Sequence, residues 1–255
     1  MTCDCANIMR IYPKINIGLK VLRKRPDGYH DIETLFVPCK AFSDSLYIEK
    51  AERFSIEIDR CAWNPEEDLT AKAYRLLRDE FDLPPVKISL HKGIPVGAGL
   101  GGGSSDGAAA LKMLNGMFGL GLSEKELADR ASRLGSDCPF FIYDRPMFGE
   151  GRGEIFTPCE IDLSGYEIRV EMPEGVSVST REAYAGVKPC GESNLKVALM
   201  QPVEKWKETV TNDFEPGIFA AHPEVAATKE RLYENGAVYA AMSGSGSAVF
   251  GLFIR

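Results

Sequence analysis

The sequence predicts a soluble globular chain that mixes β-strands with α-helices around one glycine-rich loop. Apolar residues alternate in several short runs, as at Val86, Ile88 and Leu90, which is the pattern of a strand with one buried face. Elsewhere apolar residues recur at helical spacing, as they do between residues 70 and 81. Five glycines fall between Gly97 and Gly103, directly after the strand expected at 86–90.

The part of the chain before this loop is expected to contain strands, one turn and one helix. Residues 11–21 alternate, with Ile15, Ile17, Leu19 and Val21 on one face, so a half-buried strand with Lys14 pointing away from that row is expected. Pro26 and the pair Asp27-Gly28 then mark a turn that brings Tyr29 and His30 side by side. Two more alternating strands are expected near 46–48 and 54–58, followed by the helix at 70–81.

After the loop the pattern becomes helical. A first helix carries Leu111, Leu114 and Phe118 on one stripe, and Ser123 with Glu126 forms a capping box for a second helix, which we expect to stop at Gly135. Asp137 follows at once. Its simplest interpretation is the cap of a short helix with Pro139 in the first turn, and the alternative is a functional carboxylate.

Glycines at 149, 151 and 153 and Pro158 suggest a domain boundary near residue 155, which gives an N-terminal domain of residues 1–155 and a C-terminal domain of residues 156–255. In the second half we expect a strand over 168–172 and a helix from about Glu224 that ends at Asn235-Gly236. Two strand-like runs, 237–242 and 248–254, then close the chain and are joined by a glycine-serine loop at 243–247.

Charge and cysteine content narrow the class of protein. A formal net charge of -7 argues against a general binder of nucleic acid or of anionic membranes, since phosphate backbones favour clustered Lys and Arg. No apolar run approaches the length of a membrane span, and residues 1–10 lack a signal pattern, so a cytoplasmic protein is expected. The seven cysteines are scattered and form no CxxC pair, so they are expected to be reduced thiols rather than disulfides or zinc ligands: Cys3, Cys5, Cys39, Cys61, Cys138, Cys159 and Cys190.

The glycine-rich loop is best interpreted as a phosphate cradle. A glycine run that exposes successive N–H groups and then enters a helix suits an anion, whereas a flexible linker fits poorly between two patterned segments. Gly97, Gly99 and Gly102 satisfy the dinucleotide spacing G-x-G-x-x-G, but the preceding strand alternates and no acidic residue ends a following strand. A Walker A loop is excluded because Ser, not Lys, follows the last glycine.

Phosphoryl transfer without a Walker lysine needs a positive charge from elsewhere and an acid that orients the acceptor hydroxyl. Lys14 and Asp137 are the candidates that the pattern offers, although a lysine in such a strand is more often simply solvated. Three stretches, taken together and in this order, resemble the GHMP kinase superfamily: Pro13-Lys14-Ile15-Asn16, the loop from Pro95 to Ser105, and Met242-Ser243-Gly244-Ser245-Gly246-Ser247. The resemblance covers nearly the whole chain.

The resemblance implies a two-domain α+β fold, with an N-terminal domain like the second domain of ribosomal protein S5 and a ferredoxin-like C-terminal domain. It implies that Lys14 and Asp137 are the catalytic pair. It also implies ATP and Mg²⁺ as cofactors, with the ATP loop formed by Pro95, Val96, Gly97, Ala98, Gly99, Leu100, Gly101, Gly102, Gly103, Ser104 and Ser105. Ser104 and Ser105 are the candidates for a contact to the metal.

Two further segments, Arg25 to His30 and Gly135 to Phe141, resemble the branch of this family whose substrate carries a cytidine diphosphate. The resemblance then implies a substrate-binding set of Asn16, Tyr29, His30, Thr180, Tyr184, Ser243, Gly244 and Ser245, in which Tyr29 and His30 recognise the cytosine. The chain departs from the usual pattern at Tyr12-Pro13, where Pro-Ala is more common, and in Gly135-Ser136-Asp137-Cys138, where Gly-Ala-Asp-Val is common.

Two alternatives remain open on the sequence. One is a GHMP kinase for another small alcohol, of the homoserine or mevalonate type, which the turn at Asp27 to His30 argues against. The other is a non-catalytic binding module, since an S5-like fold also serves the ribosome. We expect a small-molecule substrate, no nucleic acid or membrane partner, and a monomer or homodimer.

Overall fold

The computed structural model describes residues 8–255, which form two compact units. The first unit takes the described residues up to Pro13 together with 42–95 and 101–144, and the second takes 14–41, 96–100 and 145–255. The chain therefore passes between the units several times, and the glycine-rich loop contributes residues to both. The division of the chain into consecutive halves at residue 155 stays a prediction.

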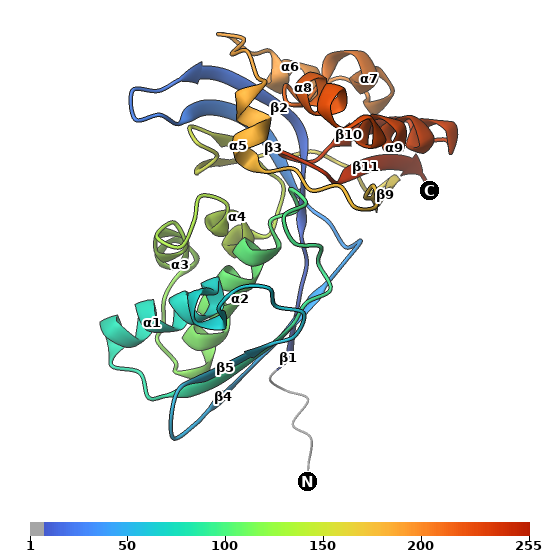
Figure 1. Cartoon of the computed structure of the whole chain (residues 1–255). Helices are drawn as coiled ribbons and strands as arrows, with labels where there is room; N and C mark the ends of the chain where they lie inside the picture. Colours follow the sequence, from blue (N-terminus) through green and yellow to red (C-terminus); the bar gives the residue numbers. More distant parts are fainter. Residues whose placement is uncertain (1–7) are drawn as a thin grey trace. The chain divides into compact units, whose positions relative to one another are not determined.

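The first unit is a four-stranded sheet with helices packed on it (Figure 1). Strands β1 (Ile8–Ile11), β4 (Asp44–Lys50), β6 (Val86–His91) and β5 (Ser55–Ile58) lie in the order β1-β4-β6-β5, and only the β5–β6 pair is parallel. The helical segments are η2 (Pro65–Glu67), α1 (Leu69–Phe81), α2 (Gly102–Met117), α3 (Glu124–Ala131) and α4 (Cys138–Tyr143). Leu46, Ile48, Ile88 and Leu90 are buried, as the alternation predicts for one face of a sheet.

Local sequence signals account for the ends of two of these helices. The Asp68 carboxylate accepts the Thr70 N–H at 2.9 Å and so caps α1, and the capping box of Ser123 and Glu126 at the start of α3 is confirmed. The expected stop at Gly135 is wrong, since α3 ends at Ala131 and irregular turns follow. Ser132 at its C-cap donates its hydroxyl to the Asp129 carbonyl at 2.7 Å, a local bond that competes with further helix.

The second unit contains two antiparallel sheets. Strands β2 (Lys14–Lys24), β3 (His30–Pro38), β7 (Met147–Glu150) and β8 (Ile155–Pro158) form one in the order β2-β3-β7-β8. Strands β10 (Tyr239–Met242), β11 (Val249–Ile254) and β9 (Tyr166–Glu171) form the other in the order β10-β11-β9. The helical segments are α5 (Thr180–Ala185), α6 (Leu195–Leu199), η3 (Val203–Lys205), α7 (Trp206–Thr209), α8 (Glu215–Ala221) and α9 (Pro223–Glu234).

Strand β2 differs from the half-buried strand that the alternation predicts. The expected run from residue 11 is interrupted, because β1 ends at Ile11 and β2 begins at Lys14. Residues on both faces of β2 are buried from Lys14 to Leu19, so Lys14 does not point into solvent. The pairing with β3 shifts at Gly18, whose φ of +65° few other residues adopt. A Cβ there would lie 2.5 Å from the Leu195 side chain.

The core of the second unit joins β2 to the C-terminal elements. Leu19 and Val21 belong to one buried cluster with Val225 and Leu232 of α9 and Val249 of β11. The helix expected from about Glu224 begins at Pro223 and ends at Glu234, with the predicted stop Asn235-Gly236 directly after it and Gly236 at a φ of +94°.

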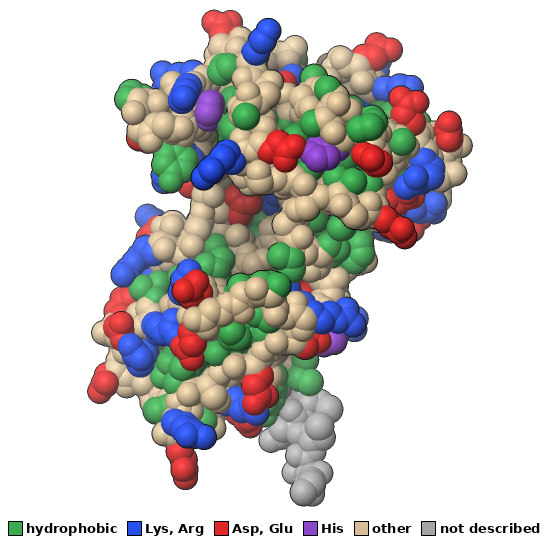
Figure 2. Space-filling view, in the orientation of Figure 1, with side chains coloured by type: hydrophobic (Ala, Val, Ile, Leu, Met, Phe, Trp, Pro, Cys, Tyr) green, Lys and Arg blue, Asp and Glu red, His purple; other side chains and the backbone are tan. Residues whose placement is uncertain are grey.

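Three further observations bear on the expected class of protein. Among residues 8–255, no helix combines the length and hydropathy needed to cross a bilayer. The five cysteines within this range are free thiols, and Cys3 and Cys5 lie outside it. On the face drawn in Figure 2, acidic and basic side chains are interspersed over each unit.

Candidate active site

In the second unit, the start of β2 and the middle of the glycine-rich loop meet at Lys14. The Lys14 side chain is 3% exposed, and its ammonium donates to Asn16 Oδ1 at 2.6 Å and to the Gly99 carbonyl at 2.8 Å. Its backbone N–H donates to the Leu100 carbonyl at 3.0 Å. A buried ammonium keeps its charge only when oxygens replace its water, and these two oxygens hold the cation at a defined position beside the loop.

The C-terminal glycine-serine loop joins the same cluster. Ser243 is fully buried, and its hydroxyl accepts the Asn16 N–H at 3.2 Å and donates to the Gly99 carbonyl at 3.0 Å. Gly99 itself is tightly enclosed, with a φ of +77°, and a Cβ there would lie 2.2 Å from the Ser243 carbonyl oxygen. Three stretches that are far apart in the sequence, around residues 14, 99 and 243, therefore form one hydrogen-bonded cluster in the second unit.

Two residues that sequence reasoning missed support this cluster. Asn212 is 2% exposed, and its side-chain amide donates to the carbonyls of Met242 and Gly244 at 2.8 Å each. Thr34 of β3 accepts the Asn16 amide at 3.2 Å and donates to the Gly18 carbonyl at 2.5 Å. Neither residue lies in a motif, so no local signal could have identified them.

In the first unit, the last part of the loop leads into α2. Gly101 is the N-cap, with a φ of +72°, and no side chain caps the helix. The first-turn amides of a helix carry a partial positive charge, and no side chain among residues 8–255 caps those of α2. This segment has the properties of an anion site.

The two serines of the loop differ in what their hydroxyls bind. The Ser105 side chain is 2% exposed and donates to the Gly102 carbonyl at 2.7 Å, a bond within the helix. Ser104 is half-buried, and its hydroxyl favours a lower pKa of the Cys138 thiol at the start of α4, against the larger effect of burial. Burial raises the pKa of the Cys138 thiol to about 12, so this group stays protonated at neutral pH.

Asp137 immediately precedes α4 and is half-buried. A short helix with Pro139 in its first turn is present, as the capping interpretation predicts, but the Asp137 side chain makes no cap hydrogen bond. Ser136 Oγ lies 3.4 Å from Asp137 Oδ1. The carboxylate is therefore placed at a helix start without serving as its cap.

The turn at residues 25–30 presents its aromatic residues in the second unit. It is closed by the Arg25 N–H, which donates to the Tyr29 carbonyl at 2.7 Å, and the Arg25 guanidinium binds Asp31 at 3.0 Å. The Tyr29 ring is 57% exposed, with the Arg152 guanidinium 4.9 Å from its centroid.

His30 stacks on Tyr184 of α5, with ring centroids 4.6 Å apart and an angle of 19° between the planes. Phe214 also packs against Tyr184 in an edge-to-face pair, at 4.8 Å between centroids. Burial, and then the charge of Lys24, lower the pKa of His30, so the ring is neutral at neutral pH. Thr180 is exposed at the first position of α5, one turn before Tyr184.

The first unit also holds a buried ionic cluster that the sequence did not suggest. Lys92 lies between Asp44 and Asp106, at 2.5 Å from a carboxylate oxygen of each. Burial works against the charge of Lys92, but the two carboxylates outweigh it and raise the pKa of the ammonium. Burial raises the pKa of Asp106 well above its ordinary value, against the pull of Lys92.

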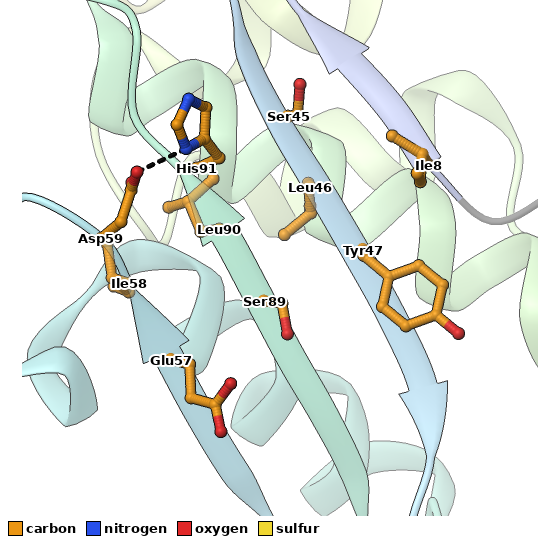
Figure 3. Close-up of a pocket in the computed structure, with 10 residues that line it drawn as sticks. All are labelled: Ile8, Ser45, Leu46, Tyr47, Glu57, Ile58, Asp59, Ser89, Leu90 and His91. Atoms are coloured by element: carbon orange, nitrogen blue, oxygen red, sulfur yellow. Dashed lines mark ion pairs between the residues drawn. The ribbon is translucent and has the colours of Figure 1, made fainter. Parts of the chain in front are cut away.

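A pocket of about 490 Å³ lies elsewhere in the first unit, on the strands of its sheet (Figure 3). Tyr47 and Ser89 line it, and His91 forms an ion pair with Asp59 at its rim. None of the predicted site residues lines it, so this pocket is not the predicted site.

The donor set bears on whether the site suits Mg²⁺. Among residues 8–255, no group of three or more His, Cys, Asp or Glu side chains could hold a metal ion. Mg²⁺ is often held by few protein ligands together with water and substrate phosphates. Mg²⁺ at this site therefore stays a prediction.

The loop and the lysine suit a protein that transfers phosphate. Such a protein, when it lacks a Walker lysine, needs amides that bind the phosphates and a cation from another part of the chain. Here the loop runs into an uncapped helix, and one of its carbonyls holds the buried lysine. The comparisons with known proteins agree. Residues 68–145 match the family described as GHMP kinases N terminal domain, and residues 198–255 match GHMP kinases C terminal.

Relatives and solved structures give the same family. The 4-diphosphocytidyl-2-C-methyl-D-erythritol kinase of Bacteroides thetaiotaomicron is 51% identical over 247 residues, covering 94% of this chain and 89% of that protein. A crystal structure of 4-(cytidine 5'-diphospho)-2C-methyl-D-erythritol kinase superposes with a TM-score of 0.82 at 31% identity, covering 96% of this chain and 89% of the other. The homoserine kinase of Cytophaga hutchinsonii has a TM-score of 0.74 at 14% identity, with coverage of 100% and 88%, which shows the fold alone.

The chain therefore belongs to the GHMP kinase family. The expected α+β fold of this family is confirmed. Family membership and the kinase relatives also confirm an ATP-dependent kinase, with ATP as the phosphate donor.

Proposed function

We propose that this chain transfers the γ-phosphoryl group of ATP to the 2-hydroxyl of 4-diphosphocytidyl-2-C-methyl-D-erythritol, a step of non-mevalonate isoprenoid precursor synthesis. The observation that carries the proposal is the 51% identity to a kinase named for this substrate, over 94% of the chain. The turn that presents Tyr29 and His30, with His30 stacked on Tyr184, supports it, since a cytosine ring requires flat partners and a neutral hydrogen-bonding group.

The experiment is an ATP-consumption assay with a panel of alcohols that includes the cytidylyl substrate, homoserine and mevalonate. We expect turnover with the cytidylyl substrate alone, and phosphorus NMR of the product should show a new phosphomonoester beside an intact diphosphate. Turnover with homoserine or mevalonate instead would support the other small-alcohol kinases. Absence of ATP consumption with every alcohol of the panel would favour the non-catalytic module.

In the proposed reaction, the acceptor hydroxyl oxygen forms a bond to the γ-phosphorus while the bond from that phosphorus to the β,γ-bridging oxygen breaks, and ADP leaves. Asp137 orients the hydroxyl and takes its proton. Because the transition state of phosphoryl transfer is loose, positioning by Asp137 contributes more than its basicity. Lys14 faces the charge on the moving phosphoryl group, aimed by Asn16 and the Gly99 carbonyl.

The amides at the start of α2 bind the ATP phosphates in this proposal. Mg²⁺ offsets the charge of those phosphates when it is bound. Of the two serines proposed to contact it, Ser104 is the better candidate, since Ser105 is buried and bonded within its helix. Ser243 and Asn16 hold the loop in the second unit, and a direct contact of either with substrate stays a prediction, as does one of Gly244, Ser245 or Thr180.

Substitution of the catalytic pair tests these roles. Removal of one preorganised charge typically lowers turnover by about 10²–10³. We expect losses of that size for Lys14→Ala and Asp137→Ala, with circular dichroism as the control for folding. Near-full turnover in either folded variant would refute its catalytic assignment.

The cytosine contacts need a separate test. Stacking on an aromatic ring is worth about 1–3 kcal/mol per base. Tyr29→Ala should therefore raise the KM for the cytidylyl substrate by about fivefold or more. An unchanged KM, together with unchanged discrimination against a uridylyl analogue, would remove Tyr29 from the site.

A further inference from the structure

The buried ionic cluster of Asp44, Lys92 and Asp106 joins the two ends of the glycine-rich loop within the first unit. Asp44 opens β4, Lys92 follows β6 at the entry of the loop, and Asp106 lies in α2 beyond its exit. The Lys92 side chain is 5% exposed and both carboxylates are fully buried. We call these three residues the stem clamp.

The entry of the loop is also held through its backbone. Asp59 accepts the Lys92 N–H at 2.7 Å, and Asp44 accepts the N–H groups of Gly93 and Ile94 at 2.6 and 2.7 Å. Three consecutive amides are thus bound by carboxylates immediately before Pro95. One Asp44 oxygen holds the backbone while the other holds Lys92, so backbone and side chain are fixed together.

The exit of the loop packs directly on this entry. A Cβ at Gly102 would lie 2.9 Å from the Ile94 side chain and 3.7 Å from the Lys92 ammonium. Lys92 reaches past Gly102 to Asp106, which is four residues further along α2. The ammonium therefore ties the first turns of α2 to the strand end that precedes the loop.

A contribution to stability does not by itself explain why the stem clamp is ionic. A buried ion pair is often replaced by apolar residues without loss of stability, and here one cation serves two buried carboxylates. Asp106 Oδ1 is moreover a buried oxygen without a hydrogen-bond partner among residues 8–255. Such groups are rare in native proteins and call for a reason beyond packing.

We propose that Lys92 is a positioning residue for ATP, which holds the uncapped first turn of α2 at a fixed place relative to the loop entry through Asp106 and Asp44. The inference rests on the proposed function in one respect, since it takes residues 101–105 as the site of the ATP phosphates. Lys92 acts through the backbone, because its own charge is taken up by the two carboxylates. Displacement of the α2 amides weakens ATP binding and leaves acceptor binding intact.

The test compares Lys92→Met with Lys87→Met. Lys87 lies within β6 and also forms an ion pair, at 3.0 Å from Glu57, but this pair is on the surface and away from the glycine-rich loop. A small misplacement of a binding group can cost up to about 100-fold, so we expect Lys92→Met to raise the KM for ATP about tenfold or more. The KM for the cytidylyl substrate should stay within about twofold in both variants, and Lys87→Met should change neither.

Asp106 supplies a second pair of variants, which keeps the proposal testable if Lys92→Met does not fold. Asp106→Leu removes the tether to α2 and leaves Lys92 paired with Asp44, so we expect the same selective rise in the KM for ATP. Asp106→Asn keeps an oxygen for Lys92 and should restore the wild-type KM. A purely structural role would instead lower the melting temperature of Asp106→Leu and leave the KM for ATP unchanged.

Direct binding of a non-hydrolysable ATP analogue, measured by calorimetry, separates this inference from the proposed function. If wild-type protein binds the analogue but does not phosphorylate the cytidylyl substrate, the proposed acceptor is wrong, and the stem clamp is judged on the dissociation constants alone. A dissociation constant within about twofold of wild type in both Lys92→Met and Asp106→Leu would overturn the positioning role.

Discussion

Replacement of Gly99 by alanine probes the most tightly enclosed glycine of the second unit. Gly99 has a φ of +77°, a conformation that costs a residue with a Cβ roughly 1–2 kcal/mol. The added methyl would lie 2.2 Å from the Ser243 carbonyl oxygen and 3.1 Å from the Gly246 nitrogen, both backbone atoms that have no rotamer to change. Overpacking of this kind adds roughly 1–3 kcal/mol, so the free energy of unfolding should fall by about 2–5 kcal/mol.

Gly97 provides the matched control. It lies two residues earlier in the same loop, with a φ of +71°, but a Cβ there meets no atom within 4 Å. The free energy of unfolding of Gly97→Ala should therefore fall only by the cost of the left-handed backbone conformation, about 1–2 kcal/mol. Urea unfolding followed by tryptophan fluorescence measures both variants, and the difference of about 1–3 kcal/mol between them isolates the contact with the Ser243 loop.

Equal losses in the two variants would refute the close approach at Gly99. The same pair tests the orientation of Lys14, because the Gly99 carbonyl accepts both the Lys14 ammonium and the Ser243 hydroxyl. Turnover at saturating substrates should fall further in Gly99→Ala than in Gly97→Ala. If it does not, the carbonyl of Gly99 does not aim the lysine.

Three other predictions address single groups. The pKa of His30 in the folded protein lies below its ordinary value of 6.5. The ring is therefore neutral above pH 6.5 and becomes protonated as the pH falls through the lowered pKa. The KM for the cytidylyl substrate should therefore rise on acidification below 6.5, and His30→Gln should remove this limb of the pH profile. Alkylation of the native protein at pH about 8, mapped by mass spectrometry, should label the exposed Cys190 and spare the buried, protonated Cys138 until urea is added. Labelling of Cys138 at the same rate as Cys190 would contradict its burial. In α2, Gly116→Ala meets no atom within 4 Å and should raise the free energy of unfolding by about 0.5–1 kcal/mol, whereas Gly107→Ala, with its Cβ 2.9 Å from that of Leu69, should lower it.

The parts of the fold that could be predicted are those that local sequence determines. Strand β6 shows strict alternation, α1 has a helical stripe behind an aspartate cap, and the capping box at Ser123 is a contact between neighbours in sequence. The short helices α5 to α8 have at most seven residues, too few for a periodic pattern. Strand β3 was missed because most of its residues are buried on both faces, so it does not alternate.

The candidate site could also be predicted only in part. Sequence motifs identified Lys14, the glycines and Asp137, but hydrogen bonds within the site join residues that are far apart in the chain. Asn16 and Ser243 are separated by 227 residues, and Lys92 and Asp44 by 48. Asp44 and Asn212 look like ordinary polar residues in sequence, and only the tertiary fold brings them against the loops that they bind. Burial on both faces of β2, which decides that Lys14 is not solvated, is likewise a property of the packed unit.

The middle and the end of the glycine-rich loop present opposite backbone groups. Its middle presents a carbonyl, that of Gly99, to the ammonium of Lys14, and its end presents amides at the start of α2, where no side chain caps them. A Walker loop places its lysine within the loop itself. In the proposed site the cation is Lys14 of β2, so the loop turns one peptide oxygen toward the lysine before it turns its amides toward the proposed phosphates. Gly99 and Gly101, at φ values of +77° and +72°, allow that change of direction, which explains why glycines are needed at both positions and not only where the phosphates are proposed to bind.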